Sequence, residues 1–266
     1  MFSTRPAAVA GRFYPADPTA LRQQIRTFAP DARDIAPAPK ALIAPHAGYP
    51  YSGPIVGRAY ARLYQARNRI ERVVLLGPAH FVRLRGLALP EADAFETPLG
   101  ITPVDTKAAT SIADLPQVIR NDRPHASEHS LEVHLPFLQA TLETFSVVPI
   151  VVGDASHEEV ATVIERLWGG PETLIVISTD LSHYLDHTSA RRMDAATAEA
   201  IEALQPERIG FEQACGRIPL GGLLQVARRR GMRVERLDLR NSGDTAGPRN
   251  QVVGYGAWAV FEGGEA

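Results

Sequence analysis

Three histidines and one aspartate closely follow apolar segments of this sequence. His46 ends the segment ALIAPH, His80 ends VVLLGPAH, and Asp180 and His183 lie in LIVISTDLSH. If these segments are parallel strands of an open α/β sheet, their carboxyl ends meet at one edge, where such sheets bind ligands. A single histidine in such a loop is more often structural than functional, but three at equivalent positions predict a polar site at that edge.

The segment RPHASEHSLEVHLPFLQ, residues 123–139, is rich in groups that transfer protons or bind metal ions. It contains His125, Glu128, His129, Glu132 and His134. A helix capped by Ser127 would place His129 and Glu132 on one face. Imidazole paired with carboxylate suits proton transfer or the orientation of a metal ligand. We expect His125 and His134 to lie on a solvated face of this helix.

Cys215, in EQACGRIPLGGLL, is the one cysteine of the sequence. Its local sequence favours a small buried hydrophobic residue. A thiolate beside two imidazoles would instead be a soft ligand for iron, copper or zinc, and spacing alone does not decide between these readings. A lone cysteine excludes an intrachain disulfide framework and fits a reducing compartment.

The elements that must position these residues alternate along the sequence. Apolar runs bounded by glycine, proline or charge predict strands at 41–44, 73–76, 86–89, 147–152, 174–178, 234–239 and 252–261. Three- and four-residue apolar spacing predicts helices at 18–28, 54–64, 107–113, 157–168, 189–204 and 221–230. The alternation predicts one α/β domain over residues 1–266, with a mostly parallel central sheet flanked by helices.

Composition narrows the classes of partner and compartment. The chain has 266 residues, 45% hydrophobic and 22% charged, which is typical of a globular protein. A net charge of −2 gives no electrostatic reason to expect nucleic acid or an anionic membrane as partner. No run approaches the roughly 20 apolar residues that span a bilayer. The first residues lack the apolar core of a signal peptide, so we expect a cytoplasmic protein.

Sequence motifs of common enzyme classes are missing. GYGAWA superficially matches a dinucleotide-binding glycine pattern, but it lies in a strand-like run without a following helix. The sequence contains no GxSxG, GxxxxGK[ST] or HExxH. The residues alone therefore indicate an α/β protein with a histidine-rich edge that could bind a metal ion.

Several longer segments carry a more specific resemblance. They are VAGRFYPADP, APHAGYPYSG, LLGPAH, EHSLEVHLPFL, STDLSHY, CGRIPLGGLL and SGDTAGPRNQVVGYGAW. In order and spacing they resemble the Memo family, also called AmmeMemoRadiSam system protein B, over nearly the whole chain. The resemblance implies a fold similar to the catalytic subunit of class III extradiol ring-cleavage dioxygenases.

The resemblance also implies a set of site residues. The positions that match the family's metal ligands are His46, His80 and Cys215. Around them we expect three catalytic residues, with His183 as general base, His129 as proton donor and Asp180 orienting a histidine. We further expect Tyr49 and Glu132 to contact the substrate.

The implied chemistry is oxidation at a non-haem metal. Class III dioxygenases hold Fe(II) with two histidines and a carboxylate. The resemblance makes Fe(II) the expected ion. Because Cys215 stands at the third position here, Cu or Zn are alternatives, and ring-cleavage activity does not follow from the resemblance alone. Two other functions stay open. One is a non-catalytic adaptor whose pocket binds a peptide or small molecule, with AMMECR-like and radical SAM proteins as partners, and the other is a zinc hydrolase.

Overall fold

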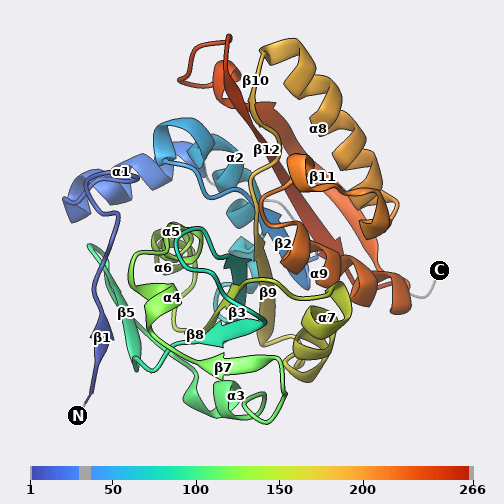
Figure 1. Ribbon diagram of the computed structural model, residues 1–266. Helices are drawn as coiled ribbons and strands as arrows, with labels where there is room; N and C mark the ends of the chain where they lie inside the picture. The colour runs from blue at the N-terminus through green and yellow to red at the C-terminus, as the bar shows by residue number, and fades with distance from the viewer. Residues whose placement is uncertain (1, 30–36, 264–266) are drawn as a thin grey trace.

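A nine-stranded mixed sheet forms the centre of the computed structural model, which describes residues 2–29 and 37–263 (Figure 1). Its strands are β2 (Ala41–Ala44), β3 (Arg72–Pro78), β4 (Leu87–Leu89), β7 (Val118–Arg120), β8 (Ser146–Val152), β9 (Thr173–Ser178), β10 (His183–Leu185), β11 (Arg233–Asn241) and β12 (Val252–Phe261). They lie in the order β10-β12-β2-β9-β3-β8-β4-β7, and β11 pairs with β12.

The four strands β2, β9, β3 and β8 run parallel at the middle of this sheet. They are almost wholly apolar because both of their faces are covered, as is usual for parallel strands. Antiparallel strands flank them, with β12 beside β2 and β4 beside β8. The α/β class predicted from the sequence is confirmed, and the parallel pairing is concentrated at the centre of a mixed sheet.

Helices cover both faces of the sheet (Figure 1). They are α1 (Pro18–Phe28), α2 (Tyr49–Ala61), α3 (Thr106–Thr110), α4 (Arg123–Ala126), α5 (His129–Glu132), α6 (Leu135–Thr141), α7 (His157–Arg166), α8 (His187–Glu202) and α9 (Arg217–Arg229). Side chains of α1, α2, α5 and α6 pack on one face, and those of α3, α7, α8 and α9 on the other. Successive residues of β3 contribute to opposite cores, as pleating requires.

Local sequence fixes where several helices begin. Asp17 caps α1, which has proline at its start, and Ser156 and Glu159 form a capping box on α7. Helix α2 begins at Tyr49, five residues before the predicted start at Pro54, because Pro50 occupies its first turn. Short 3-10 helices complete the described secondary structure: η1 (Tyr64–Ala66), η2 (Pro206–Arg208), η3 (Phe211–Gln213) and η4 (Ser242–Asp244).

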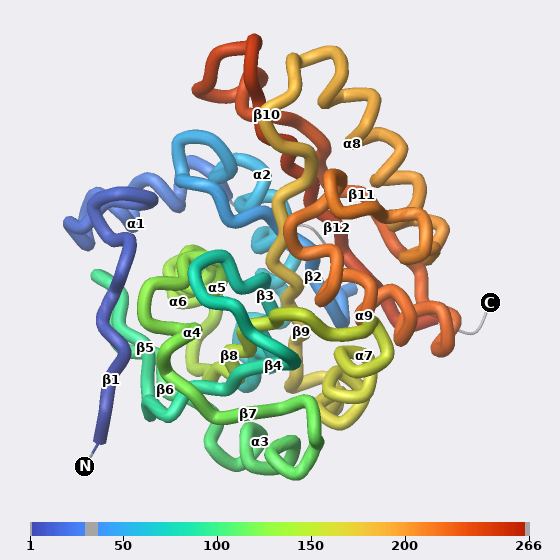
Figure 2. Tube along the Cα trace, in the orientation of Figure 1, coloured from blue at the N-terminus to red at the C-terminus, as the bar shows by residue number. Residues whose placement is uncertain are grey.

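A second, three-stranded sheet fastens the N-terminal segment. It has the order β1-β5-β6, from β1 (Thr4–Arg5), β5 (Ala94–Thr97) and β6 (Gly100–Pro103). Figure 2 shows the N-terminal chain running beside β5. Within the described residues, no helix has the length and apolarity needed to cross a bilayer.

Candidate metal centre

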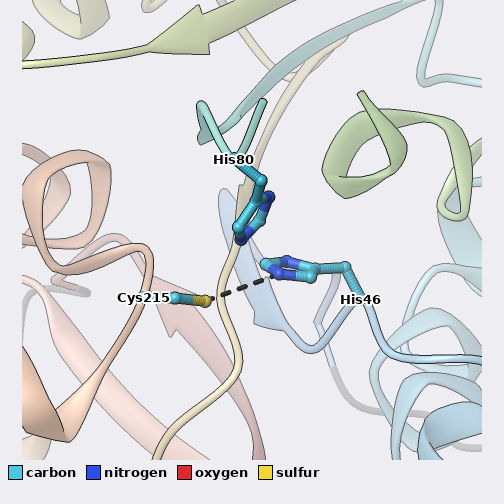
Figure 3. Close-up of side chains that lie close together, drawn as sticks. All are labelled: His46, His80 and Cys215. Atoms are coloured by element: carbon cyan, nitrogen blue, oxygen red, sulfur yellow. Dashed lines mark hydrogen bonds between the residues drawn. The ribbon is translucent and has the colours of Figure 1, made fainter. Parts of the chain in front are cut away.

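Three loops bring His46, His80 and Cys215 together (Figure 3). His46 lies two residues beyond β2, His80 two residues beyond β3, and Cys215 two residues before α9. Each offers one ligand atom, and these atoms all lie within 4.8 Å of one another. The Sγ of Cys215 is 3.4 Å from Nε2 of His46. Residues that are distant in the sequence therefore form one cluster at the carboxyl ends of the parallel strands.

The tautomer of His46 follows from its hydrogen bonds. Its Nδ1 is 2.6 Å from Oγ of Ser178, whose hydroxyl donates to the carbonyl of Ser130 at 2.6 Å. Because that hydroxyl proton is already donated to Ser130, Oγ of Ser178 accepts a hydrogen bond from Nδ1–H of His46. Burial lowers the pKa of His46 well below its usual value, so the ring is neutral. Its Nε2 therefore carries the lone pair, which faces Sγ of Cys215 and could bind a cation that displaces the thiol proton.

His80 is held in the same tautomer by Glu128. The Nδ1 of His80 lies 2.8 Å from Oε1 of Glu128, and its backbone N–H donates to Oε2 at 2.7 Å. Burial opposes ionisation of Glu128, but hydrogen bonds from His80 and from the backbone N–H of Ser130 outweigh it and lower the carboxyl pKa to about 2. An ionised carboxylate on Nδ1–H is the usual partner of a metal-binding histidine, and it leaves Nε2 of His80 free.

Cys215 lies in a pocket of backbone groups. Its Sγ accepts a hydrogen bond from the backbone N–H of Asp180 at 3.3 Å. Burial and the nearby Asp180 raise the pKa of the thiol to about 12, so the sulfur is protonated until a cation displaces the proton. The next residue, Gly216, is required because a Cβ there would lie 2.5 Å from the carbonyl oxygen of Ser178.

Asp180 joins the loops that carry His46 and Cys215. Its Oδ1 accepts the backbone N–H of His46 at 2.8 Å, and its carbonyl accepts the backbone N–H of Cys215 at 3.2 Å. Burial raises the pKa of this carboxyl to about 6. Its Oδ2 is 3.9 Å from Nε2 of His46, which is too long for a hydrogen bond. Asp180 thus orients His46 through the backbone.

The donor set could hold a metal ion. Four-coordinate ions with ligand bonds of about 2.0–2.3 Å hold their ligand atoms roughly 3.3–3.8 Å apart. The separation of 3.4 Å between Cys215 and His46 lies in this range. His80, Glu128 and His129 form an overlapping group, but both Glu128 oxygens already accept N–H donors. The set with two imidazoles and one thiol is therefore the better candidate.

His129 borders the cluster. Its ring stacks on His80 at 4.7 Å and meets His46 edge-on at 5.4 Å, while Phe13 packs on it at 4.7 Å. Burial lowers its pKa to about 4. Among the described residues its Nδ1 has no hydrogen-bond partner. Glu128, not the predicted Ser127, caps the helix at this point, because the Glu128 carboxylate accepts from the backbone N–H of Ser130.

His183 lies near the same site without a fixed partner. It is half-buried in β10, and its positive form would lower the pKa of both Asp180 and His46. Within the part of the chain that the structure describes, its ring nitrogens make no hydrogen bond. Its imidazole is therefore available to a bound molecule.

Tyr49 and Glu132 are both fully engaged by other protein groups. The Tyr49 hydroxyl donates to the carbonyl of Val133 at 2.8 Å. The Glu132 carboxylate is fully buried and accepts hydrogen bonds from Arg5, Tyr14 and the backbone N–H groups of Ala8 and Val9. Substrate contact by these two residues stays a prediction, and the geometry gives both of them a structural role.

The expected solvated positions of His125 and His134 are wrong. Their exposed fractions are 1% and 0%. His125 donates from Nε2 to the carbonyl of Ala88 at 3.0 Å, and Nδ1 of His134 lies 3.0 Å from the hydroxyl of Tyr60. Residues 123–141 form three short helices, so the faces expected from one continuous helix are rotated. Prolines in the first turns of α4 and α6 mark those breaks.

Two residues that support the ligands were not selected from the sequence as site residues. Ser178 is the last residue of β9 and looks like part of a buried strand. Glu128 was noted in the acidic and histidine-rich segment, but nothing in its spacing pairs it with His80, 48 positions away. Such partners depend on how β3 and α5 pack.

Comparisons with known proteins place this site in a family. A family model described as "Memo-like protein" matches residues 5–259. The chain belongs to the Memo-like family. A MEMO1 family protein of Aquifex aeolicus is 36% identical over 263 residues, covering 94% of this chain and 97% of that protein. Another, of Archaeoglobus fulgidus, is 36% identical over 273 residues, covering 97% and 99%.

A solved structure supports the fold. The crystal structure of an uncharacterized protein of Escherichia coli K12 matches with a TM-score of 0.50 and 12% identity, covering 81% of this chain and 98% of that one. At this identity the likeness concerns the fold alone. The family assignment made from the motifs is confirmed.

Proposed function

We propose that this Memo-like protein is a metal-dependent oxidoreductase in which His46, His80 and Cys215 bind Fe(II). The observation that carries this proposal is the matched tautomer of the two histidines. Each ring donates Nδ1–H to a buried oxygen, of Ser178 or Glu128, and keeps Nε2 for a cation beside the thiol. A structural histidine on a solvated surface does not need a buried acceptor that fixes its tautomer, and here both histidines have one.

When bound, the ferrous ion would supply a Lewis acid and a site for oxygen activation. The protein's own residues would hold and move protons. His183 has no described hydrogen-bond partner and is assigned as general base. His129 is assigned as proton donor, because its Nδ1 makes no described hydrogen bond and lies 3.4 Å from Oε1 of Glu128. Asp180 keeps His46 and Cys215 in register.

Because Cys215 supplies a thiol, the identity of the bound metal directly tests the Fe(II) proposal. Sulfur is softer than the carboxylate of ring-cleaving dioxygenases, so copper and zinc are the competing ions. Protein purified without oxygen should contain about one equivalent of iron, or bind Fe(II) in preference to Zn(II) when titrated with both. Protein that contains only zinc and hydrolyses model esters would contradict the oxidoreductase proposal and support a zinc hydrolase.

Oxygen consumption tests the reaction class. Iron-loaded protein should consume oxygen with at least one member of a catechol panel, and His46→Ala should abolish that uptake together with iron binding. Uptake that persists in His46→Ala would come from free iron and would contradict the proposal. If fully iron-loaded wild-type protein takes up no oxygen with any catechol, catechol oxidation is excluded as its reaction.

A binding module is the second candidate, because two exposed aromatic rings line the cavity beside the metal centre. Phe81 is 61% exposed and Phe211 is 77% exposed. Such rings are common at protein interfaces. Recovery of an AMMECR-like or radical SAM protein in stoichiometric amount from native extract, without turnover by the iron-loaded protein, would favour this function.

A further inference from the structure

A cavity of about 750 Å³ opens directly onto the candidate metal centre. His80 and Cys215 lie in its wall. Residues 78–85, from the last residue of β3 onward, form one side, and the segment from Phe211 through the first turn of α9 forms another. The cavity is large enough for a small organic molecule whose reacting end meets the metal ligands.

The charges along this cavity are unbalanced. Its lining contains three arginines, Arg83, Arg85 and Arg217, against one carboxylate, Asp154. The cavity is therefore positive, although the whole chain has a net charge of −2. Arg85 is already engaged, with Nη1 3.0 Å from the carbonyl of Asp154 and Nη2 3.4 Å from Glu159.

Arg217 and Arg83 have no carboxylate partner among the residues that the structure describes. Arg217 is half-buried, and its described contact is the ring of Phe211, 5.8 Å from the guanidinium carbon. It occupies the first position of α9, where the helix dipole disfavours a cation. Neither the helix nor a neighbouring acid explains this positive charge, whereas an anion in the cavity would.

The rest of the lining is apolar and partly aromatic. It includes Phe81, Val82, Leu84, Phe211 and Ile218. A planar apolar body would pack against these side chains and exclude water from the guanidinium, which strengthens an ion pair. Arginine matches carboxylate and phosphate groups with two parallel N–H donors.

We infer that the substrate of this site is an aromatic anion, whose carboxylate or phosphate is bound by Arg217, with Arg83 as a second cation. The inference rests on the proposed function for one part only, the reacting end placed at His80 and Cys215. The anionic group lies towards the N-terminal turn of α9, and the apolar body lies between this group and the reacting end.

Matched ligands test this in metal-free protein, so that direct coordination does not contribute. The probes are 2-naphthoate, its neutral analogue 2-naphthamide, and 2-naphthyl phosphate, with calorimetry or NMR titration as the readout. Wild-type protein should bind one or both anions roughly tenfold or more tightly than the amide. The stronger of the two anions identifies the acidic group.

Two arginines on the same helix provide the variant and its control. Arg217→Gln should remove the preference for the anion, Arg217→Lys should retain part of it, and the amide should bind both variants as it binds the wild type. Arg228→Gln removes the same charge from α9 at an exposed site paired with Glu207, and should leave all affinities within twofold. Thermal unfolding confirms that each variant is folded.

The outcomes separate this inference from the proposed function. Equal affinities for naphthoate, naphthyl phosphate and naphthamide, no binding of any of the three, or an unchanged anion preference in Arg217→Gln would overturn the aromatic-anion assignment. A protein that binds the anions through Arg217 but takes up no metal ion would overturn the oxidoreductase and leave the anion site in place.

Discussion

At the scale of single residues, Cys215 is where a structural and a functional role differ most in measurable outcome. If Cys215 is only a small buried residue, its change to alanine should lower the free energy of unfolding of the protein by only about 1 kcal/mol. As the third ligand, its loss leaves two imidazoles on the ion. We expect Cys215→Ala to stay folded and to bind Fe(II) at least tenfold more weakly, measured by anaerobic titration. Equal affinities would leave His46 and His80 in need of another partner.

His183 separates proton transfer from metal binding. Because it is half-buried and lies outside the group of converging ligand atoms, His183→Ala should retain the metal content of the wild type. Oxygen uptake should fall by roughly 100-fold, the usual contribution of a general base. His46→Ala is the control that loses the ion. Elemental analysis of both variants decides this, and equal metal loss would make His183 a ligand.

The buried ring of His134 should make the stability of the protein depend on pH. Burial lowers its folded-state pKa to about 3, against about 6.5 when unfolded. As pH falls below about 6.5, the unfolded chain gains a proton that the folded protein refuses, so stability falls; at pH 5 the loss from this residue is about 2 kcal/mol. Metal-free His134→Asn should therefore lose about 2 kcal/mol less than the wild type between pH 7.5 and 5 in urea unfolding.

Tyr60→Phe is the matched control for this pH dependence. It removes the hydroxyl beside Nδ1 of His134 but keeps the imidazole buried. Its stability should decline with falling pH at least as steeply as that of the wild type. A decline in His134→Asn identical to that of the wild type would show that this ring takes up its proton in the folded state.

At the scale of elements, Glu132 in α5 holds the N-terminal segment. Its carboxylate binds Arg5 of β1, Tyr14, and the backbone N–H groups of Ala8 and Val9 between them. Glu132→Gln leaves the buried Arg5 without a counter-charge, and the free energy of unfolding should fall by about 3 kcal/mol in chemical denaturation. Glu143→Gln, an exposed member of a surface ion pair, should change it by less than about 1 kcal/mol. A fall below about 1 kcal/mol in Glu132→Gln would contradict this role.

The same elements show what the sequence could predict. All seven expected strands are present, because runs such as VVLL and LIVIS are too apolar to lie anywhere but in a covered sheet. Strands β1, β5, β6, β7 and β10 were missed, because these short segments lack the continuous apolar run that marks the equally short β2 and β4. The helix at 107–113 ends early, at Thr110.

At the scale of the whole molecule, the candidate site could be located but not assembled from the sequence. The strand ends after β2, β3 and β9 mark the edge where His46, His80 and Asp180 lie, which periodicity reveals. Cys215 is 169 positions from His46, and only the family resemblance joined them. Supporting contacts such as those of Glu128 and Ser178 arise from packing between elements, for which one sequence carries no local signal.

Metal binding should stabilise the entire fold. A ligand that binds the native state and not the unfolded chain stabilises it by about 2.7 kcal/mol at 100 times its dissociation constant. Fe(II) should therefore raise the unfolding temperature of the wild type, with a dependence on metal concentration that is absent in His46→Ala. An unchanged unfolding temperature at saturating Fe(II) would show that the ion does not bind these residues in the native protein.

The scattered origin of the three donors has a consequence for biosynthesis. Cys215 emerges from the ribosome long after His46 and His80, and its loop takes its position against Asp180 and Ser178 at the end of β9. No short stretch of nascent chain holds a preformed chelate, unlike a zinc finger whose ligands are neighbours. If these residues bind an ion, the polypeptide must complete its sheet before the site exists. The metal would then be acquired by a finished protein, from whichever pool of ions that protein meets.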